Sequence, residues 1–338
     1  MSLPEYAELH CISNFTFLRG ASHPAELMER AAELGYRALA ITDECSMSGV
    51  VRAHLAAKDA GVKLIIGSEF RLDDGTRLVA LAVNLEGYGN LCELITQGRR
   101  RADKGSYRLT REDFAQGLPH CLVLWVPGDP RDVATAKWIR ETFPGRSWVA
   151  VELHLNIGDR QRTEQLKTLG LPLTATGDVH MHVRGRRRLQ DTVTAIRLGK
   201  SVLEARGQLY KNAERHLRRR ERLAKIYPAD LLRETIEIAE RCTFSLDDIE
   251  YQYPKELVPE NHTATTWLRV LTEEGTKIRW PSGVPDKAHS QIEHELKLIA
   301  ELGYEPYFLT VHDVVRFARS KSILCRSEEH TSELQSRH

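Results

Sequence analysis

An aspartate and two histidines stand at alternate positions directly after a short apolar run that ends in glycine. They are Asp178, His180 and His182, and the run before them covers residues 172–176. Side chains at alternate positions of an extended segment point the same way, so these three could face one point just beyond the end of a strand. Carboxylate and imidazole groups together are the ligands of many zinc and manganese sites. The spacing therefore predicts a polar site, with a metal site as one form of it.

Carboxylates and imidazoles also follow several earlier apolar runs. The main set that could converge with the first stretch comprises His10, Glu44, Glu69, Asp178 and His180. The additional candidates are Asp43, His154 and His182. Taken alone, each of these residues is more often a satisfied structural group than a ligand. As one ring, they have the ligand types for two or three metal ions that act on a phosphate ester.

Strands and helices that alternate along the chain would position these residues. Compact apolar runs predict strands at 6–10, 38–42, 63–67, 77–83, 120–126, 148–153 and 172–176. Helical patterns are found at 24–34, 50–60, 87–97, 131–142, 159–168 and 186–198. Repeated alternation of this kind predicts parallel strands with right-handed crossovers, in an open sheet or a barrel. We favour a (β/α)7 barrel of the α/β class over residues 1–210, because a barrel gathers the polar strand ends into one site.

The pattern changes after the expected barrel. We expect a helical connection and linker over residues 211–260, with helices at 212–225 and 229–242 and an extended stretch at 251–259. Residues 261–325 would begin another domain, with an amphipathic helix up to Leu302 and a strand starting at 323–325. Residues 326–338 are polar and lack periodicity, so we expect them to be a non-native tail that packs against nothing.

Composition limits the classes of protein to consider. The chain has 338 residues, of which 41% are hydrophobic and 28% are charged, and its six cysteines form no Cys-x-x-Cys pair. That spacing argues against a zinc ribbon and against a disulfide scaffold. No apolar run approaches the roughly 20 residues of a membrane span, and no secretory signal is visible. A cytoplasmic protein without a membrane partner is therefore expected.

The charge of the chain is unevenly distributed. The net charge is only +1, but residues 184–225 contain 14 Lys and Arg against four Asp and Glu, and we call this segment the basic band. One interpretation is contact with a phosphate backbone, for which Arg218, Arg219 and Arg220 are the candidates. The other is a solvated, arginine-rich helical surface.

Four motifs resemble a known family. Glu8-Leu-His-Cys-Ile-Ser-Asn14, Ala40-Ile-Thr-Asp-Glu44, Ile65-Ile-Gly-Ser-Glu-Phe70 and Gly177-Asp-Val-His180 are similar to successive motifs of the polymerase-and-histidinol-phosphatase (PHP) domain. That domain opens the bacterial C-family polymerases, the polymerase III alpha subunits. Residues 6–22 and 293–311 resemble the error-prone second alpha subunit more closely. The resemblance covers residues 1–325.

The resemblance implies a PHP-type barrel, a mostly helical segment and the start of a polymerase palm domain. It implies a DNA-directed DNA polymerase used for translesion synthesis and repair after damage, with DNA and dNTPs as substrates and Mg²⁺ as cofactor. A sliding clamp and damage-response accessory proteins are the implied partners. In this family, Ile323-Leu-Cys325 would be followed by a phosphate-binding loop and later by the palm aspartates. This chain lacks them, so it is not expected to polymerise alone, and no catalytic residue is expected in it.

Three positions depart from the family pattern. Ile12 stands at the second histidine of the expected His-x-His, Arg19 at an aspartate and Arg77 at a histidine, while the strand-six ligand falls on His154 or Asn156. Guanidinium groups repel metal ions and can pair with Glu69 or Asp178 instead. We therefore expect a degenerate metal site rebuilt as an ion-pair core, holding at most a weak Zn²⁺ or Mn²⁺. Two alternatives stay open, namely a metal-dependent phosphoesterase or 3′→5′ exonuclease in the barrel, and a non-catalytic scaffold that docks a partner.

Overall fold

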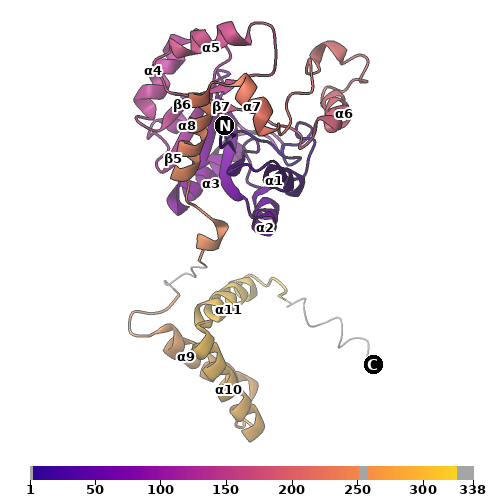
Figure 1. Ribbon diagram of the computed structural model, residues 1–338. Coiled ribbons are helices and arrows are strands. Elements are labelled where there is room, and N and C mark those ends of the chain that lie inside the picture. The colour runs from indigo at the N-terminus through magenta and orange to yellow at the C-terminus, as the bar shows by residue number, and fades with distance from the viewer. Residues whose placement is uncertain (1–2, 251–256, 326–338) are drawn as a thin grey trace. The chain divides into compact units, whose positions relative to one another are not determined.

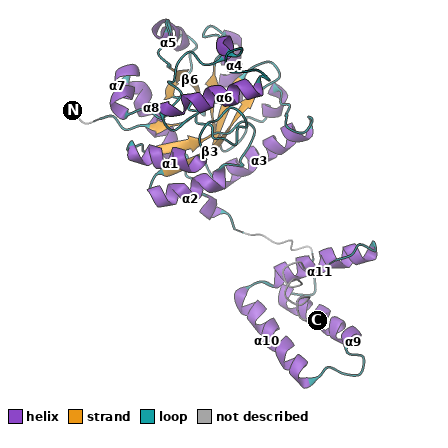
Figure 2. Cartoon of the chain, turned by 90° about the vertical axis from the view of Figure 1, so that its right-hand side faces the viewer, coloured by secondary structure: helices purple, strands orange, loops and turns teal. Residues whose placement is uncertain are grey.

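A computed structural model describes residues 3–250 and 257–325 of the chain. By their contacts, the residues divide into two compact units, of which the first ends at Ile249 and the second begins at Glu250. The first unit is a sheet surrounded by helices, and the second consists of helices and the loops between them in its described residues (Figures 1 and 2). Among the described helices, none combines the length and the apolar character that a membrane span requires.

Seven strands follow one another around the first unit in chain order. They are β1 (Ala7–Glu8), β2 (Ala38–Ile41), β3 (Lys63–Arg71), β4 (Arg77–Ala82), β5 (Cys121–Val126), β6 (Ser147–Glu152) and β7 (Leu173–Thr176). The ring is completed just beyond the first and last strands, where Cys11 pairs with Val179. The amide of Val179 donates to the carbonyl of His10 at 2.9 Å, and the amide of Ile12 donates to the carbonyl of Val179 at the same distance. The predicted seven-stranded α/β barrel is therefore confirmed.

One strand runs against the predicted direction. β4 is antiparallel to both β3 and β5, whereas the other neighbouring pairs are parallel. Only five residues join β3 to β4, and Gly75 at their turn has a φ of +86°. A parallel crossover needs a dozen residues or more, so this connection can only form a hairpin. The expectation of parallel strands throughout was wrong at this point.

Eight α-helices lie in the described residues of the first unit, and α1 to α6 are close to their predicted positions. They are α1 (Pro24–Glu33), α2 (Val50–Ala60), α3 (Leu85–Arg100), α4 (Val133–Thr142), α5 (Asp159–Lys167), α6 (Arg187–Arg197), α7 (Arg220–Ile226) and α8 (Ala229–Arg241). Local signals set several ends. The Asn84 side chain accepts from the amide of Gly87 at 3.0 Å and caps α3, and Gly61 ends α2 with a φ of +67°.

The helix expected over residues 212–225 forms only in its second half, as α7. Residues 212–219 instead run beside the segment that follows β7, where the carbonyl of Arg215 accepts from the amides of His180 at 3.0 Å and Met181 at 3.2 Å. The side chain of Asn212 also donates to the carbonyl of His154 at 2.6 Å. These tertiary contacts satisfy backbone groups that a helix would otherwise pair internally.

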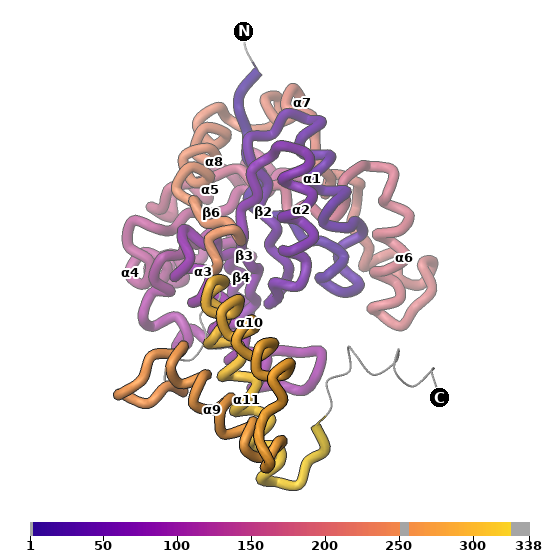
Figure 3. The backbone as a smooth tube through the Cα atoms, turned by 90° about the horizontal axis from the view of Figure 1, so that it is seen from below, coloured from indigo at the N-terminus to yellow at the C-terminus, as the bar shows by residue number. Residues whose placement is uncertain are grey.

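Two buried clusters lie on opposite faces of the strands. Ala38 and Ala40 belong to one cluster and Leu39 and Ile41 to the other, because alternate side chains of a strand point to opposite faces. The inner cluster joins residues of six strands with Ile238 of α8, and the outer cluster joins the strands to α1 through α4. Helix α8 therefore packs as part of the barrel (Figure 3).

The second unit contains α9 (Ala264–Arg279), α10 (Asp286–Leu302) and α11 (Glu305–Ser320). Only Leu268, Glu305 and Leu309 are buried among its described residues. The strand expected at 323–325 is absent from the described residues, where the chain has no regular structure after α11. Most of the expected linker, residues 251–256, and the expected tail, residues 326–338, lie outside the described residues.

Candidate functional site

Three of the five main candidate residues meet inside one end of the barrel. His10 follows β1, Glu69 lies within β3, Asp178 follows β7, and their potential ligand atoms lie within 4.8 Å of one another. All three side chains are buried. Glu69 has the same strand parity as Ile65 of the inner cluster, so the pleat directs its carboxylate into the barrel.

His10 lies between two carboxylates. Its Nε2 is 2.7 Å from Oε2 of Glu69, and its Nδ1 is 3.2 Å from Oε1 of Glu152. Carboxylate oxygens only accept hydrogen bonds, so both ring nitrogens must donate, and His10 is an imidazolium in this arrangement. Burial alone would lower the pKa of His10, but Glu152 and Glu69 together raise it.

Glu152 is a site residue that the sequence interpretation missed. It is the last residue of β6 and lies two positions before His154, which was chosen instead. Alternate positions share a face, so Glu152 lies on the face expected for His154 but two residues earlier in the chain. The side chain of His154 contacts the carbonyl of Gly177 at 2.9 Å through Nε2 and does not join the cluster. Asn156 is exposed.

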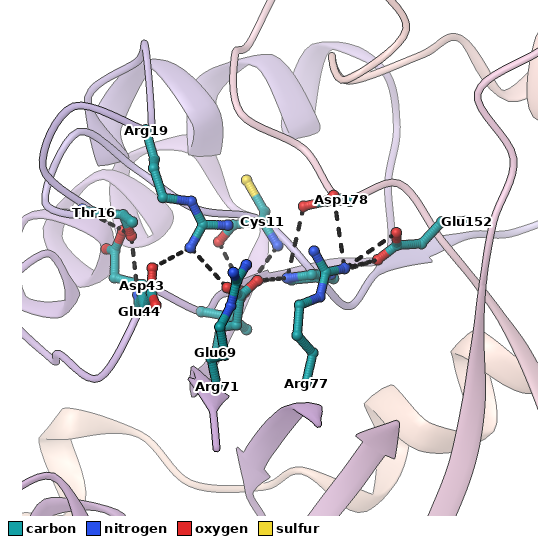
Figure 4. A network of polar contacts seen from close by, with 12 residues as sticks. Cys11, Thr16, Arg19, Asp43, Glu44, Glu69, Arg71, Arg77, Glu152 and Asp178 are labelled. Atoms are coloured by element: carbon teal, nitrogen blue, oxygen red, sulfur yellow. Dashed lines mark hydrogen bonds and ion pairs between the residues drawn. The ribbon is translucent and has the colours of Figure 1, made fainter. Parts of the chain in front are cut away.

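Arg19 connects two carboxylates of the site. Its Nη1 donates to Oε1 of Glu69 at 2.8 Å and also to Glu44, whose other oxygen accepts from the hydroxyl of Tyr107 at 2.9 Å (Figure 4). Burial would raise the pKa of Glu69, but Arg19 and His10 hold it well below its usual range. Glu44 therefore faces Arg19, at the edge of the cluster and not within it.

Two further arginines neutralise the remaining carboxylates. Arg77, the first residue of β4, donates to Glu152 at 3.2 Å and lies 4.0 Å from Asp178. Figure 4 shows Arg77 between these two carboxylates. Arg215, from the extended segment before α7, donates to Oδ2 of Asp178. Burial lowers the pKa of Arg215 to about 10, which leaves it charged at neutral pH. The sequence carried no signal for Arg215, because the segment was interpreted as helix.

His180 is close to the cluster but contacts only one of its members. Its Nε2 is 2.9 Å from Oδ1 of Asp178, and its ring meets Tyr210 edge-on at 5.3 Å. Burial and then Arg19 lower its pKa well below the usual value, so the neutral ring donates from Nε2 to Asp178. Its buried Nδ1 has no hydrogen-bond partner within the described residues.

The remaining candidates have local structural contacts. Asp43 accepts hydrogen bonds from the amides and hydroxyls of Ser13 and Thr16, at 2.7 to 3.1 Å, and so orders the loop after β1. His182 contacts the hydroxyl of Ser22 at 2.8 Å through Nδ1. Ile12 is fully buried and offers no lone pair.

Glu8 holds the loops that carry the cluster. Its Oε1 accepts from the amide of Gly177 at 2.8 Å and from the amide of His10 at 3.1 Å, while Oε2 accepts from the hydroxyl of Tyr6 at 2.8 Å. Asp178 follows Gly177 in the chain and has a φ of +43°. This is a left-handed conformation that aspartate tolerates better than most residues. Glu8 thus positions His10 and Asp178 through their backbone, a role that the sequence interpretation did not assign.

The described arrangement does not fit a metal ion. A ligand must present a free lone pair, but both nitrogens of His10 face carboxylates. Both oxygens of Glu69 accept from cationic side chains, and the oxygens of Asp178 accept from Arg215 and His180. Every ligand atom of the three-residue cluster is therefore already paired, and a cation added there would meet three guanidinium groups.

The basic band is less uniform than its composition suggests. Arg218 is only 2% exposed and donates to the carbonyl of Leu153 at 2.8 Å and to the hydroxyl of Tyr227 at 3.2 Å. It is therefore inaccessible to DNA and cannot make the phosphate contact that one of the two interpretations assigned to it. Arg219 is exposed, and Arg220 is half-buried with Nη1 at 3.4 Å from the carbonyl of Pro4.

Comparison with known proteins gives the relationships of both units. Residues 8–124 match the PHP domain family, and residues 266–328 match the family described as the bacterial DNA polymerase III alpha NTPase domain. An error-prone DNA polymerase of Dechloromonas aromatica is 57% identical over 335 residues, which is 96% of this chain and 33% of that protein. The error-prone DNA polymerase of Methylococcus capsulatus is 58% identical over 95% of this chain and 31% of that protein.

The chain is homologous to part of the bacterial error-prone DNA polymerases. It spans about a third of the length of these curated relatives. Among solved structures, a putative metal-dependent phosphoesterase from Bifidobacterium adolescentis aligns with a TM-score of 0.41 and 14% identity, over 52% of this chain and 88% of that one. The sequence similarity to the error-prone DNA polymerases extends over 95–96% of this chain in the two relatives.

Proposed function

We propose that the polar cluster in the barrel is an ion-pair core with a structural role. We also propose that the full-length protein is an error-prone DNA polymerase. The observation that carries the proposal is the pairing of every ligand atom of His10, Glu69 and Asp178 with another charged or hydrogen-bonding side chain. Its charges also balance. Four carboxylates, from Glu44, Glu69, Glu152 and Asp178, face the cations His10, Arg19, Arg77 and Arg215.

Balanced pairing explains how these carboxylates can be stable inside the barrel. An unpaired buried charge is strongly destabilising, whereas a paired and hydrogen-bonded one is tolerated. In a two-metal phosphoesterase, the ions would supply the compensating charge and clamp the attacking and leaving oxygens. Here the guanidinium groups supply that charge, but they are not Lewis acids and cannot lower the pKa of a coordinated water molecule as a metal ion does.

A metal analysis and a nuclease assay test the barrel's role together. The purified chain, incubated with Mn²⁺, Zn²⁺ or Mg²⁺ and then dialysed, should retain no stoichiometric metal. It should release no nucleotide from the 3′ end of a labelled single-stranded oligonucleotide. The alternative phosphoesterase function is favoured by the convergence of three ligand-type residues within 4.8 Å. Hydrolysis that needs metal and is lost in both His10→Ala and Asp178→Ala would establish that alternative and overturn the structural role.

The polymerase role is proposed for the longer protein on the strength of its relatives. DNA and dNTPs would be its substrates, Mg²⁺ its cofactor, and a sliding clamp and damage-response proteins its partners. Primer extension by the full-length protein past an abasic site is the direct test. Failure to extend even an undamaged template with Mg²⁺ and all four dNTPs would contradict the proposed polymerase.

A further inference from the structure

A small pocket on the flank of the barrel is lined by arginines from three separate segments. It has a volume of about 250 Å³ and lies between the end of α1, the short helix Arg184–Arg186 and the segment before α7. Its lining comprises Arg30, Val183, Arg184, His216, Leu217, Arg219 and Arg222. We call it the arginine pocket. It lies outside the ion-pair cluster and shares no residue with it.

The arginine pocket carries more positive charge than its own carboxylates neutralise. Arg222 contacts both oxygens of the buried Glu214 at 3.1 Å, and Arg30 contacts the exposed Glu33 at 2.6 Å. Arg184 and Arg219 are exposed, and neither side chain has an ion pair or hydrogen bond with any residue that the structure describes. Four guanidinium groups therefore face two carboxylates, which leaves a local charge of +2.

One unused donor accompanies this charge. The Nε of Arg30 is buried and has no hydrogen-bond partner within the described part of the chain. His216 lines the pocket without adding a donor, because its Nδ1 donates to the carbonyl of Ala213 at 2.7 Å and burial lowers its pKa, which leaves a lone pair on Nε2. Planar, cationic donors that converge on a concave site from several segments match the oxygens of a phosphate group.

We propose that the arginine pocket binds one phosphate of a single-stranded nucleic-acid backbone. Val183 and Leu217 add apolar wall, against which a sugar can lie while the phosphate meets the arginines. A single strand is flexible enough to place one phosphate in a recess, and charged grooves that follow the backbone are common among proteins that bind it. A strand is favoured over a free anion because exposed Arg188 and Arg206 continue the basic band beyond the pocket. The inference concerns binding by this chain and does not depend on the polymerase role of the longer protein.

Two matched double variants of the whole chain test the proposal. Arg184→Gln with Arg219→Gln removes the two unpaired charges of the pocket. Arg100→Gln with Arg160→Gln removes the same charge from exposed positions outside both the pocket and the basic band. Binding of a fluorescently labelled oligothymidylate is measured by anisotropy across a salt series, and circular dichroism confirms that both variants remain folded.

The pocket variant should bind about tenfold more weakly than the wild type, with a salt slope reduced by about 0.7 for one lost phosphate contact. The control should lose no more than about twofold, since dispersed surface charges are screened. Equal losses in both variants would overturn the pocket as a site and leave only diffuse attraction. The proposal would also be overturned if the wild-type chain did not bind the oligothymidylate at low salt.

Competition experiments separate a strand from a free anion. Inorganic phosphate and thymidine monophosphate are added to the labelled complex at matched ionic strength, and an unlabelled oligothymidylate serves as the positive competitor. If only the oligonucleotide competes at micromolar concentration, the strand assignment stands. Competition by either small molecule at similar concentration would overturn it and identify a site for a free phosphate.

Discussion

His10 is the residue at which the charge balance of the barrel can be tested directly. Its imidazolium is shared by the buried Glu69 and the partly buried Glu152, so His10→Gln leaves both carboxylates with less compensation. We expect a loss of about 3 kcal/mol in the free energy of unfolding, measured by urea denaturation, as for other buried pairs that lose one partner. The control is His54→Gln, because His54 contacts an exposed carboxylate, Asp247, at 3.3 Å. A loss no larger than the control's would show that Arg19 and Arg77 already neutralise the site.

The raised pKa of His10 also predicts how the free energy of unfolding changes with pH on the alkaline side. The pKa of His10 is raised in the folded chain above the usual value of 6.5, because the two carboxylates outweigh burial. The folded state therefore binds the proton more tightly than the unfolded state. Its stabilising effect is complete below the unfolded pKa and is lost as the pH rises through the folded pKa. Urea midpoints of the wild type should fall as the pH rises above neutrality, and His10→Gln should flatten that decline.

At the level of elements, the turn after β7 depends on the absence of a side chain at Gly177. A Cβ at this position would lie 2.4 Å from Oε2 of Glu8, which is itself held by Tyr6. Gly177→Ala should therefore destabilise the chain by about 1–3 kcal/mol, the usual cost of overpacking a core. Gly89→Ala is the matched control, because Gly89 lies in α3 with nothing near its Cβ position. Alanine there should be neutral or stabilising. Thermal melts of the two variants give the comparison.

Helix α8 provides a second prediction about elements. Ile238 is fully buried in the inner cluster, and Thr235 of the same helix accepts from the amide of Ala7 at 3.1 Å. If α8 is a component of the barrel, Ile238→Ala should cost about 2–5 kcal/mol in denaturant unfolding. Ile278 in α9 is 81% exposed, so Ile278→Ala serves as its control and should change little. Similar small effects in both variants would place α8 outside the cooperative unit of the barrel.

At the level of the whole molecule, the first unit contains a complete core of its own. Both faces of its strands are covered by residues before Ile249, since the inner and outer clusters draw only on this unit. A chain of residues 1–249 should therefore fold alone, with a single cooperative unfolding transition by circular dichroism. A chain that ends at residue 210 would lack α7 and α8 and serves as the comparison. Cooperative folding of the shorter chain would show that the two helices are dispensable.

Element types and positions could be predicted from the sequence, because periodicity and capping are local. Apolar runs marked all seven strands to within a few residues, and Gly35 and Gly61 adopt the left-handed conformation that ends α1 and α2. The same reasoning placed His10, Glu69 and Asp178 near one point, since strand ends on one side of a barrel converge. Arg19 and Arg77 were recognised as departures from a ligand pattern because their charge is a property of the residue type.

Which residues contact one another across long distances in the sequence was determined only by the tertiary structure. Arg215 reaches Asp178 because residues 212–219 pair with the chain after β7 and do not form a helix, and no local pattern indicates that choice. Glu152 took the place expected for His154 because β6 pairs with β7 only as far as Glu152, and a single apolar run does not show where that pairing ends. β4 reversed its direction because its connection was too short. Residue types and local periodicity thus determined which charges are present, and long-range packing determined which of them neutralise one another.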